Sequence, residues 1–236
     1  QIKDPSYITK ENKNFLINIF IKKIIKHQPE DISLNIVYED EELLVINKPP
    51  NLVMHPAPGN ETGTLVNALI HYTKNNLSDL NDITRPGIVH RIDKETSGLL
   101  VIAKNNLAHA DLGDQFSKHI IERKYLCLAW GIIRPLNGKI NTLITRDKKN
   151  RQLMTVSEVN GKKAITNYKT IKVYNVKDIP KISLIECELE TGRTHQIRVH
   201  MNYLGHSIVG DDKYKKKFKK IKNINPLLEE KIINLN

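Results

Sequence analysis

The chain has 236 residues, 39% of them hydrophobic, enough to bury the core of one large domain or of one domain with appendages. Lys and Arg number 37 against 26 Asp and Glu, a formal net charge of +11, which favours a partner with dense negative charge over an acidic one. Its two cysteines, Cys127 and Cys187, make no disulfide framework or metal-ligand cluster, and no apolar run approaches the ~20 residues that span a bilayer. The alternative source of the charge is an AT-rich genome, which enriches protein surfaces in Lys and Asn. We expect a cytoplasmic protein.

The first third of the chain predicts a hairpin, a long loop and a helix. Residues 1–33 are polar and irregular, whereas two apolar runs around an acidic turn predict a β-hairpin over residues 36–46. Prolines and a glycine within residues 49–59 predict a loop. Thr64 can cap a helix that includes residues 65–72, where the apolar positions follow helical spacing.

The rest of the chain predicts more strands than helices. A helix is expected at residues 105–119, with Leu107, Leu112 and Phe116 turned inward, and another at residues 194–203. Strands are expected at residues 99–103, 125–130, 139–144, 153–156, 164–174 and 182–189. Without regular βαβ alternation, this order predicts an α+β fold with a mixed, mostly antiparallel central sheet flanked by helices and loops.

Asp93 is the first candidate for chemistry. It lies in a polar turn that leads through Gly98 into an apolar strand. Carboxylates act as nucleophiles or bases on electrophilic carbon, and a nearby cation, here Arg91 or Lys94, keeps an aspartate ionised. The alternative is an Asx-turn in which Asp93 caps its own backbone and the two cations face solvent.

A second group of polar residues surrounds the start of the last predicted helix. Gly192 permits a strand-to-helix turn, and Thr194 is expected to be the N-cap. Arg198 can pair with a carboxylate from elsewhere or bind a phosphate. The basic residues of this group are Arg193, His195, Arg198 and His200. A solvated basic helix face is the alternative interpretation.

Tyr125 begins a predicted strand directly after two cations. A strand aromatic is most often part of a core, but next to Arg123 and Lys124 it can also stack on an unpaired base. Residues 58–64 contain glycines but lack the Gly-Lys-Ser/Thr ending of a P-loop, so nucleotide hydrolysis has no support.

Together these segments resemble the RluA-type RNA pseudouridine synthases. Residues 90–104 are similar to the family's Asp-bearing motif, residues 47–52 to its upstream loop, and residues 191–201 to its third motif. The matching motifs keep the family's order over about residues 32–214. Residues 36–56 resemble the RluD-like branch, whose members act on large-subunit ribosomal RNA.

The resemblance implies the pseudouridine-synthase fold and a role for individual side chains. Asp93 would be the catalytic aspartate, Tyr125 the aromatic that stacks on the target uracil, and Arg198 the cation that holds Asp93 ionised. RNA binding and base flipping would fall to Arg91, Lys48, His90, Arg193 and His195. The family needs no metal or cofactor, and we expect none here. The expected reaction detaches uracil from ribose and rejoins it through carbon. We also expect a monomer. We expect the protein to bind RNA, in particular 23S ribosomal RNA, and not to associate with a membrane.

The resemblance also divides the chain. Residues 1–33 are similar to the end of an N-terminal S4-like RNA-binding domain and its linker. Residues 34–236 would be the catalytic domain, C-terminally incomplete, because the family continues into further strands that are expected to be missing here.

Two other functions fit parts of the sequence. A catalytically silent RNA-binding or ribosome-associated module would explain the charge, although not the matching positions of Asp93, Tyr125 and Arg198. A phosphatase with Asp93 as nucleophile would need Mg²⁺ and a second aspartate at the position that Glu95 occupies.

Overall fold

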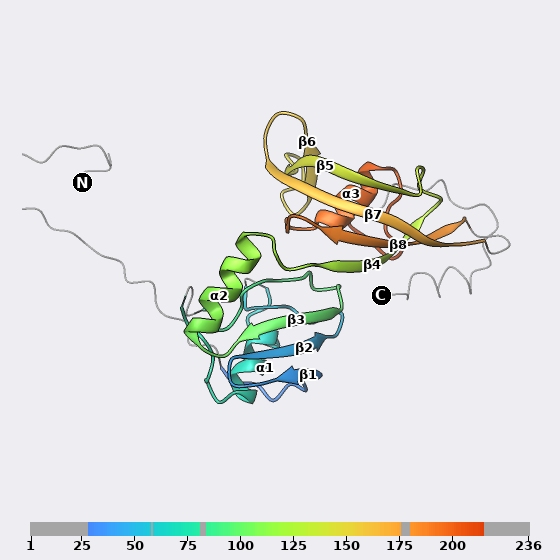
Figure 1. The fold of residues 1–236 in the computed structure, drawn as a ribbon. Coiled ribbons are helices and arrows are strands. Elements are labelled where there is room, and N and C mark those ends of the chain that lie inside the picture. Colours follow the sequence, from blue (N-terminus) through green and yellow to red (C-terminus); the bar gives the residue numbers. More distant parts are fainter. Residues whose placement is uncertain (1–27, 58, 81–83, 176–179, 215–236) are drawn as a thin grey trace, which may run out of the picture.

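The computed structural model describes residues 28–57, 59–80, 84–175 and 180–214 (Figure 1). The apolar segment 15–20, most of the predicted S4-like remnant and the chain beyond residue 214 lie outside the described residues. The division of the chain at residue 33 therefore stays a prediction.

The described chain forms two antiparallel sheets. The first has the order β1-β2-β3, and the second has the order β4-β8-β7-β5-β6. The strands of the first sheet are β1 (Ile36–Glu39), β2 (Leu43–Lys48) and β3 (Gly98–Ala103). Those of the second are β4 (Lys124–Trp130), β5 (Asn137–Arg146), β6 (Met154–Ser157), β7 (Lys162–Tyr174) and β8 (Ile182–Leu189).

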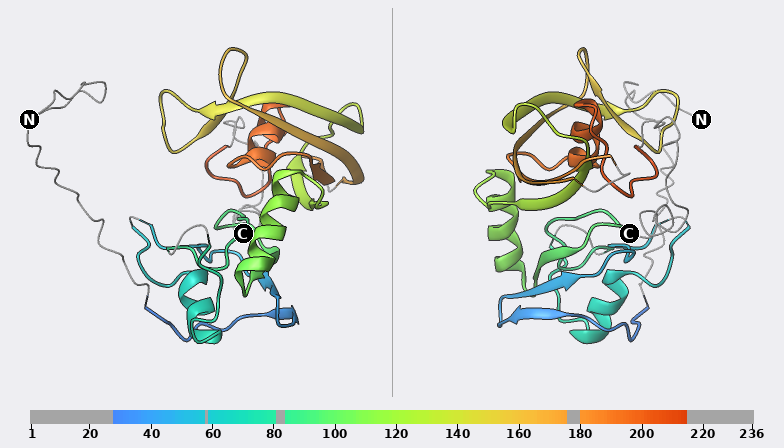
Figure 2. Two further views of the ribbon diagram at one scale, coloured as in Figure 1. Left: turned by 60° about the vertical axis from the view of Figure 1, so that its left-hand side comes forward. Right: turned by 90° about the vertical axis from the view of Figure 1, so that its right-hand side faces the viewer.

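Each sheet packs against a helix, so the described chain forms two lobes. In Figure 1 the lower lobe contains the first sheet and the upper lobe contains the second sheet. Figures 1 and 2 show α1 (Leu65–Tyr72) against the first sheet and α3 (Gln196–Tyr203) inside the curve of the second. The third helix, α2 (Asn106–Ser117), follows β3 and leads toward β4, the strand of the upper lobe that lies nearest to the lower one. The predicted α+β class with antiparallel sheets is confirmed.

Apolar alternation decides what each lobe buries. The core under β1–β3 includes Leu44, Ile46, Leu100 and Ile102, each at most 1% exposed, because alternate residues of a strand face the same side. A second core lies between β4, β8 and α3. Tyr125 packs against both cores, so it lies where the two lobes meet.

Two local predictions are wrong. Leu107 is 83% exposed although Leu112 is buried, because the two residues are five apart on α2 and so do not share the i, i+3, i+4 spacing of one helix face. Thr194 is not the N-cap of α3: the cap is His195, in the left-handed conformation with φ of 56°. The end strands β3 and β4 carry Leu99 and Leu126, which are 63% and 67% exposed.

Candidate active site

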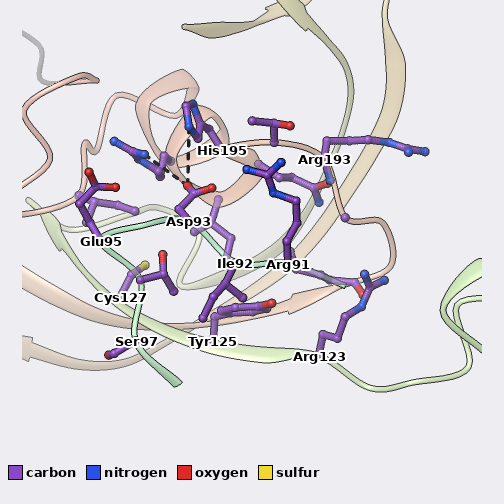
Figure 3. Close-up of a pocket in the computed structure, with 18 of the residues that line it drawn as sticks. Arg91, Ile92, Asp93, Glu95, Ser97, Arg123, Tyr125, Cys127, Arg193 and His195 are labelled. Carbon is purple, nitrogen blue, oxygen red and sulfur yellow. Dashed lines mark hydrogen bonds and ion pairs between the residues drawn. The ribbon is translucent and has the colours of Figure 1, made fainter. Parts of the chain in front are cut away.

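A cleft of about 1330 Å³ opens where the two lobes meet. Its walls come from the loop after β2, the turn before β3, the end of α2 with β4, the segment that leads into α3, and the segment after α3. Five stretches of sequence thus converge on one cavity that lies beside Tyr125 (Figure 3). A cleft of this size exceeds most small-molecule pockets and suits a nucleotide with its neighbours.

The turn that carries Asp93 is fixed by backbone contacts on both sides. The N–H of Thr96 donates to the Asp93 carbonyl at 3.2 Å, and the N–H of Val101 donates to His90 Nε2 at 3.1 Å. Ile92 is buried in the lower core, so the side chain that follows it points out of the core toward the upper lobe (Figure 3). The turn therefore presents Asp93 to the cleft.

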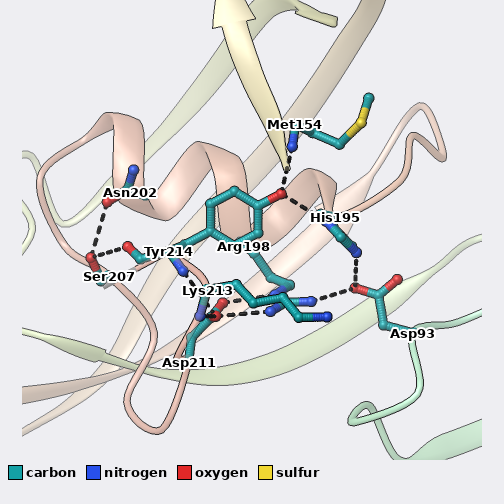
Figure 4. Close-up of polar contacts among 9 residues, drawn as sticks. All are labelled: Asp93, Met154, His195, Arg198, Asn202, Ser207, Asp211, Lys213 and Tyr214. Carbon is teal, nitrogen blue, oxygen red and sulfur yellow. Dashed lines mark hydrogen bonds and ion pairs between the residues drawn. The ribbon is translucent and has the colours of Figure 1, made fainter. Parts of the chain in front are cut away.

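Asp93 meets Arg198 across the cleft, as predicted. Arg198 Nη1 lies 3.3 Å from Asp93 Oδ2, and His195 Nε2 lies 3.9 Å from the same oxygen (Figure 4). The Asp93 side chain is 19% exposed, so it is accessible from the cleft without facing bulk solvent. The Asx-turn alternative, in which Asp93 caps its own backbone, is wrong.

Arg198 has a second and closer carboxylate, Asp211, which the sequence interpretation missed. Arg198 Nε lies 2.7 Å from Asp211 Oδ2 and Nη2 lies 2.8 Å from Oδ1, a two-point contact. Asp211 also accepts the backbone N–H groups of Lys213 and Tyr214. The available signal was a carboxylate after Gly210, inside the span of about residues 32–214 that keeps the family's motif order and 13 residues after an arginine that needs a partner.

Burial and pairing oppose each other in this ion pair. Burial alone would lower the pKa of Arg198, but the hydrogen bonds and charge of Asp211, and then of Asp93, raise it above the ordinary arginine value. Burial alone would raise the pKa of Asp211, and Arg198 more than compensates, so that this pKa is lowered. Both groups are charged at neutral pH.

Gln196 holds the segment that leads into α3. Its side chain accepts hydrogen bonds from Thr191 Oγ1 at 2.8 Å and from the N–H of Arg193 at 2.9 Å. Its amide group donates to the Ile165 carbonyl and to Thr166 Oγ1, at 2.9 and 3.0 Å. One buried side chain thus joins this segment to β7.

His195 is held by Tyr214. His195 Nδ1 lies 2.7 Å from the Tyr214 hydroxyl, and this hydroxyl accepts the backbone N–H of Met154 at 2.8 Å (Figure 4). Burial lowers the pKa of His195, so the ring is neutral near pH 7. A non-glycine residue with positive φ is uncommon and strained, and such residues cluster at functional sites.

Tyr125 lies at the bottom of the cleft, below Ile92 in Figure 3. Burial is the main cause that raises the pKa of its phenol, so the ring is neutral and largely apolar. Arg91 is exposed and lines the cleft, and Arg193 lines it while donating through Nε to the Lys163 carbonyl at 2.9 Å. The cleft therefore combines an aromatic floor with a cationic rim.

Lys48, which was expected to bind RNA, is instead an internal support, whereas His90 lines the cleft and also supports the fold. Lys48 is 0% exposed, and its Nζ donates to the carbonyls of Pro49, Leu52 and Lys94 at 2.7, 3.0 and 2.9 Å. This expectation is wrong for Lys48, because the burial of the strand end leaves no surface for a phosphate. His90 stacks on Phe116, and its Nε2 accepts the backbone N–H of Val101 in β3.

A metal-binding cluster and a membrane-spanning helix are both absent from the described residues. No group of three or more His, Cys, Asp or Glu side chains there is arranged to hold a metal ion. None of the helices in the described ranges has the length and apolar character to cross a membrane. Cys127 and Cys187 are free thiols on neighbouring strands.

The chain is similar in sequence to known RNA pseudouridine synthases. The family model described as RNA pseudouridylate synthase matches residues 42–203. The chain is 47% identical over 215 residues to the ribosomal large subunit pseudouridine synthase D of Zymomonas mobilis, covering 90% of this chain and 66% of that protein. It is 50% identical over 185 residues to an uncharacterised RNA pseudouridine synthase of Bacillus subtilis, covering 78% and 59% of the two chains.

A solved structure agrees at the level of the fold. Human RNA pseudouridylate synthase domain containing 1 superposes with a TM-score of 0.65 at 25% identity, covering 81% of this chain and 74% of that one. The chain spans about half to two thirds of the length of the curated relatives it matches. Its sequence and fold make the chain a member of the RNA pseudouridylate synthase family.

Proposed function

We propose that this protein isomerises specific uridines of RNA to pseudouridine, with large-subunit ribosomal RNA as its substrate and the cytoplasm as its location. The contact between Asp93 and Arg198 at 3.3 Å, inside a cleft with a cationic rim, carries the proposal. The relative named after the ribosomal large subunit supports the choice of substrate. The net charge of +11 fits a polyanion, and we propose that a monomer binds it.

The reaction is an isomerisation, so atoms and electrons balance without a co-reactant. The bond from uracil N1 to ribose C1′ breaks, a bond from C5 to C1′ forms, C5 loses its proton and N1 gains one. Asp93 is the group we propose to act on the substrate, as nucleophile or base. Arg198 holds it in place through the 3.3 Å contact, and Arg198 is itself held by its two contacts to Asp211.

The target base must leave its stack before it reaches Asp93. Flipping costs a few kcal/mol, which contacts to the RNA must offset. Tyr125 provides an aromatic surface for the uracil, and Arg91 lies on the rim where it can replace the displaced base. Arg193 and Arg123 add positive charge to the same cleft.

A tritium-release assay tests the proposal. RNA labelled at uracil C5 is incubated with the protein in the presence of EDTA, and tritium released to water is measured. We expect release by the wild-type protein and none by Asp93→Asn, while RNA binding persists, because the amide keeps the shape but not the charge. Asp114→Asn, a surface residue paired with Lys118, is the matched control and should behave as wild type.

Each other result has a defined meaning. Release by Asp93→Asn equal to wild type would remove Asp93 from the chemistry. Binding of RNA without release by the wild-type protein would instead support the silent RNA-binding module. Release that requires Mg²⁺ would contradict a reaction carried by side chains alone.

A further inference from the structure

The two polar contacts that the described residues make with the Asp93 side chain end on one oxygen. Arg198 Nη1 approaches Oδ2 at 3.3 Å, and His195 Nε2 approaches it at 3.9 Å (Figure 4). Within the described chain, Oδ1 is then the oxygen without a protein partner. A carboxylate that acts on a substrate must be held in its productive orientation by neighbouring groups, and here the contacts to Oδ2 do so while Oδ1 faces none of the described polar groups.

The tautomer of His195 is assigned from its partner on the other side. The Tyr214 hydroxyl accepts the Met154 N–H at 2.8 Å and has one proton of its own to donate. Among the contacts that the described residues make with this hydroxyl, the acceptor for its proton is His195 Nδ1, 2.7 Å away. In a neutral ring the remaining proton is then on Nε2, which faces Asp93.

The surroundings of the ring support a fixed, neutral imidazole. Its side chain is 15% exposed, and burial is the main cause that lowers the pKa of His195. The charges that act on it are Asp93 and Asp211, which favour its protonation, and Arg198 and Lys213, which oppose it. The left-handed backbone at residue 195 directs the ring into the space between Tyr214 and Asp93.

We propose that His195 is a positioning residue for Asp93 and not an RNA contact. Its Nε2–H, oriented by Tyr214, acts with Arg198 on Oδ2, so that Oδ1 is the oxygen presented to the substrate. A separation of 3.9 Å is longer than a hydrogen bond, and such contacts in free enzymes tighten when the substrate is bound. This inference rests on the proposed function and assigns a role to a residue that the sequence placed among the RNA contacts.

Two substitutions separate positioning from binding. His195→Asn tolerates the left-handed backbone but has no donor that reaches Asp93. His195→Gln has a side-chain N–H at about the place of Nε2 and does not titrate. With tritium release as the assay, we expect His195→Asn to lower kcat on the order of 10- to 100-fold with KM unchanged, and His195→Gln to restore most of the loss.

The control is His71→Asn on the exposed side of α1, which should keep the wild-type kcat. A rise in KM with unchanged kcat for His195→Asn would return His195 to RNA binding. An unchanged kcat and KM would overturn the proposal entirely, and so would a failure of His195→Gln to exceed His195→Asn.

A measurement without turnover keeps the inference separate from the proposed function. Nitrogen-15 NMR of the His195 ring should show a proton on Nε2 in the wild-type protein and a mixture of tautomers in Tyr214→Phe. A wild-type ring protonated on Nδ1 would overturn the positioning role even if the enzyme is active. Absence of tritium release with Nε2 protonated would instead reject the proposed function and keep this geometry.

Discussion

Arg198 makes two hydrogen bonds to Asp211, through Nε and Nη2, and contacts Asp93 through Nη1 alone. The paired contacts to Asp211 are 2.7 and 2.8 Å, whereas the contact to Asp93 is 3.3 Å. Asp211 is 4% exposed, so it anchors the guanidinium, and Asp93 meets a cation that is already fixed. The charged group in the cleft therefore consists of three residues, Asp93, Arg198 and Asp211, and not of the predicted pair of Asp93 and Arg198.

Removal of the anchor should cost both stability and activity. For Asp211→Asn we expect the free energy of unfolding to fall by about 3 kcal/mol, because a largely buried guanidinium loses its closest counter-charge. Turnover should fall as well, since the guanidinium that holds Asp93 in place is then no longer fixed. Denaturant unfolding monitored by circular dichroism measures the first effect. The surface variant Asp114→Asn should change stability by less than about 0.5 kcal/mol, and equal losses in both would contradict the anchoring role.

Lys48 should matter for folding and not for RNA. In Lys48→Met the carbonyls of Pro49, Leu52 and Lys94 lose their shared donor, and we expect a loss of about 3 kcal/mol in the free energy of unfolding. The exposed Lys118 supplies the control, Lys118→Met, which should be close to neutral.

The salt dependence of RNA binding distinguishes Lys48 from the cleft rim. The plot of log affinity against log salt should keep its slope in Lys48→Met, at a temperature where the variant is folded, because this ammonium touches no phosphate. Arg91→Ala should reduce the slope by about 1 if Arg91 binds one phosphate. A reduced slope for Lys48→Met would show that the buried ammonium reaches RNA after all.

Stability should fall in mild acid because of buried histidines. Burial lowers the pKa of His200 from 6.5 to about 4, where Thr142 and Thr166 flank its ring. The unfolded chain binds this proton more readily, so the contribution of His200 is complete above pH 6.5 and is lost as the pH falls toward 4. His90 adds the same dependence, since burial also lowers its pKa to about 4.

Substitution of His200 tests this sign. Between pH 6.5 and 4, His200→Gln should reduce the slope of unfolding free energy against pH by as much as about 1.4 kcal/mol per pH unit. Urea denaturation at several pH values gives the slope, and His71→Asn controls for the loss of an exposed histidine. An unchanged slope in His200→Gln would mean that His200 does not resist protonation.

Gln196 should control the order of the segment before α3. For Gln196→Leu we expect a loss of about 3 kcal/mol, because buried groups of Thr191, Arg193 and Ile165 lose their partner. Hydrogen exchange of residues 191–195 should become faster than in the wild type. The exposed Gln152 offers the comparison Gln152→Leu, and similar exchange in both variants would argue against this role.

Much of the local structure could be predicted from the sequence. The hairpin of β1 and β2, the helix after Thr64 and the long strand β8 follow from apolar period and from turn residues, which act between near neighbours. Leu107 was misplaced because it is five residues from Leu112 and falls outside the buried stripe of the helix. The candidates Asp93, Tyr125 and Arg198 came from motif order, and the cleft brings all three together.

The family, the α+β class and the identity of the acidic and basic groups could be inferred from the sequence, because these depend on residue types and their order. The folded structure was needed to find that Lys48 is buried, that Asp211 holds Arg198, and that His195 lies between Tyr214 and Asp93. Contacts of this kind join residues that are distant along the chain, and burial of an ionisable side chain depends on which strands and helices cover it. A one-dimensional pattern contains neither piece of information.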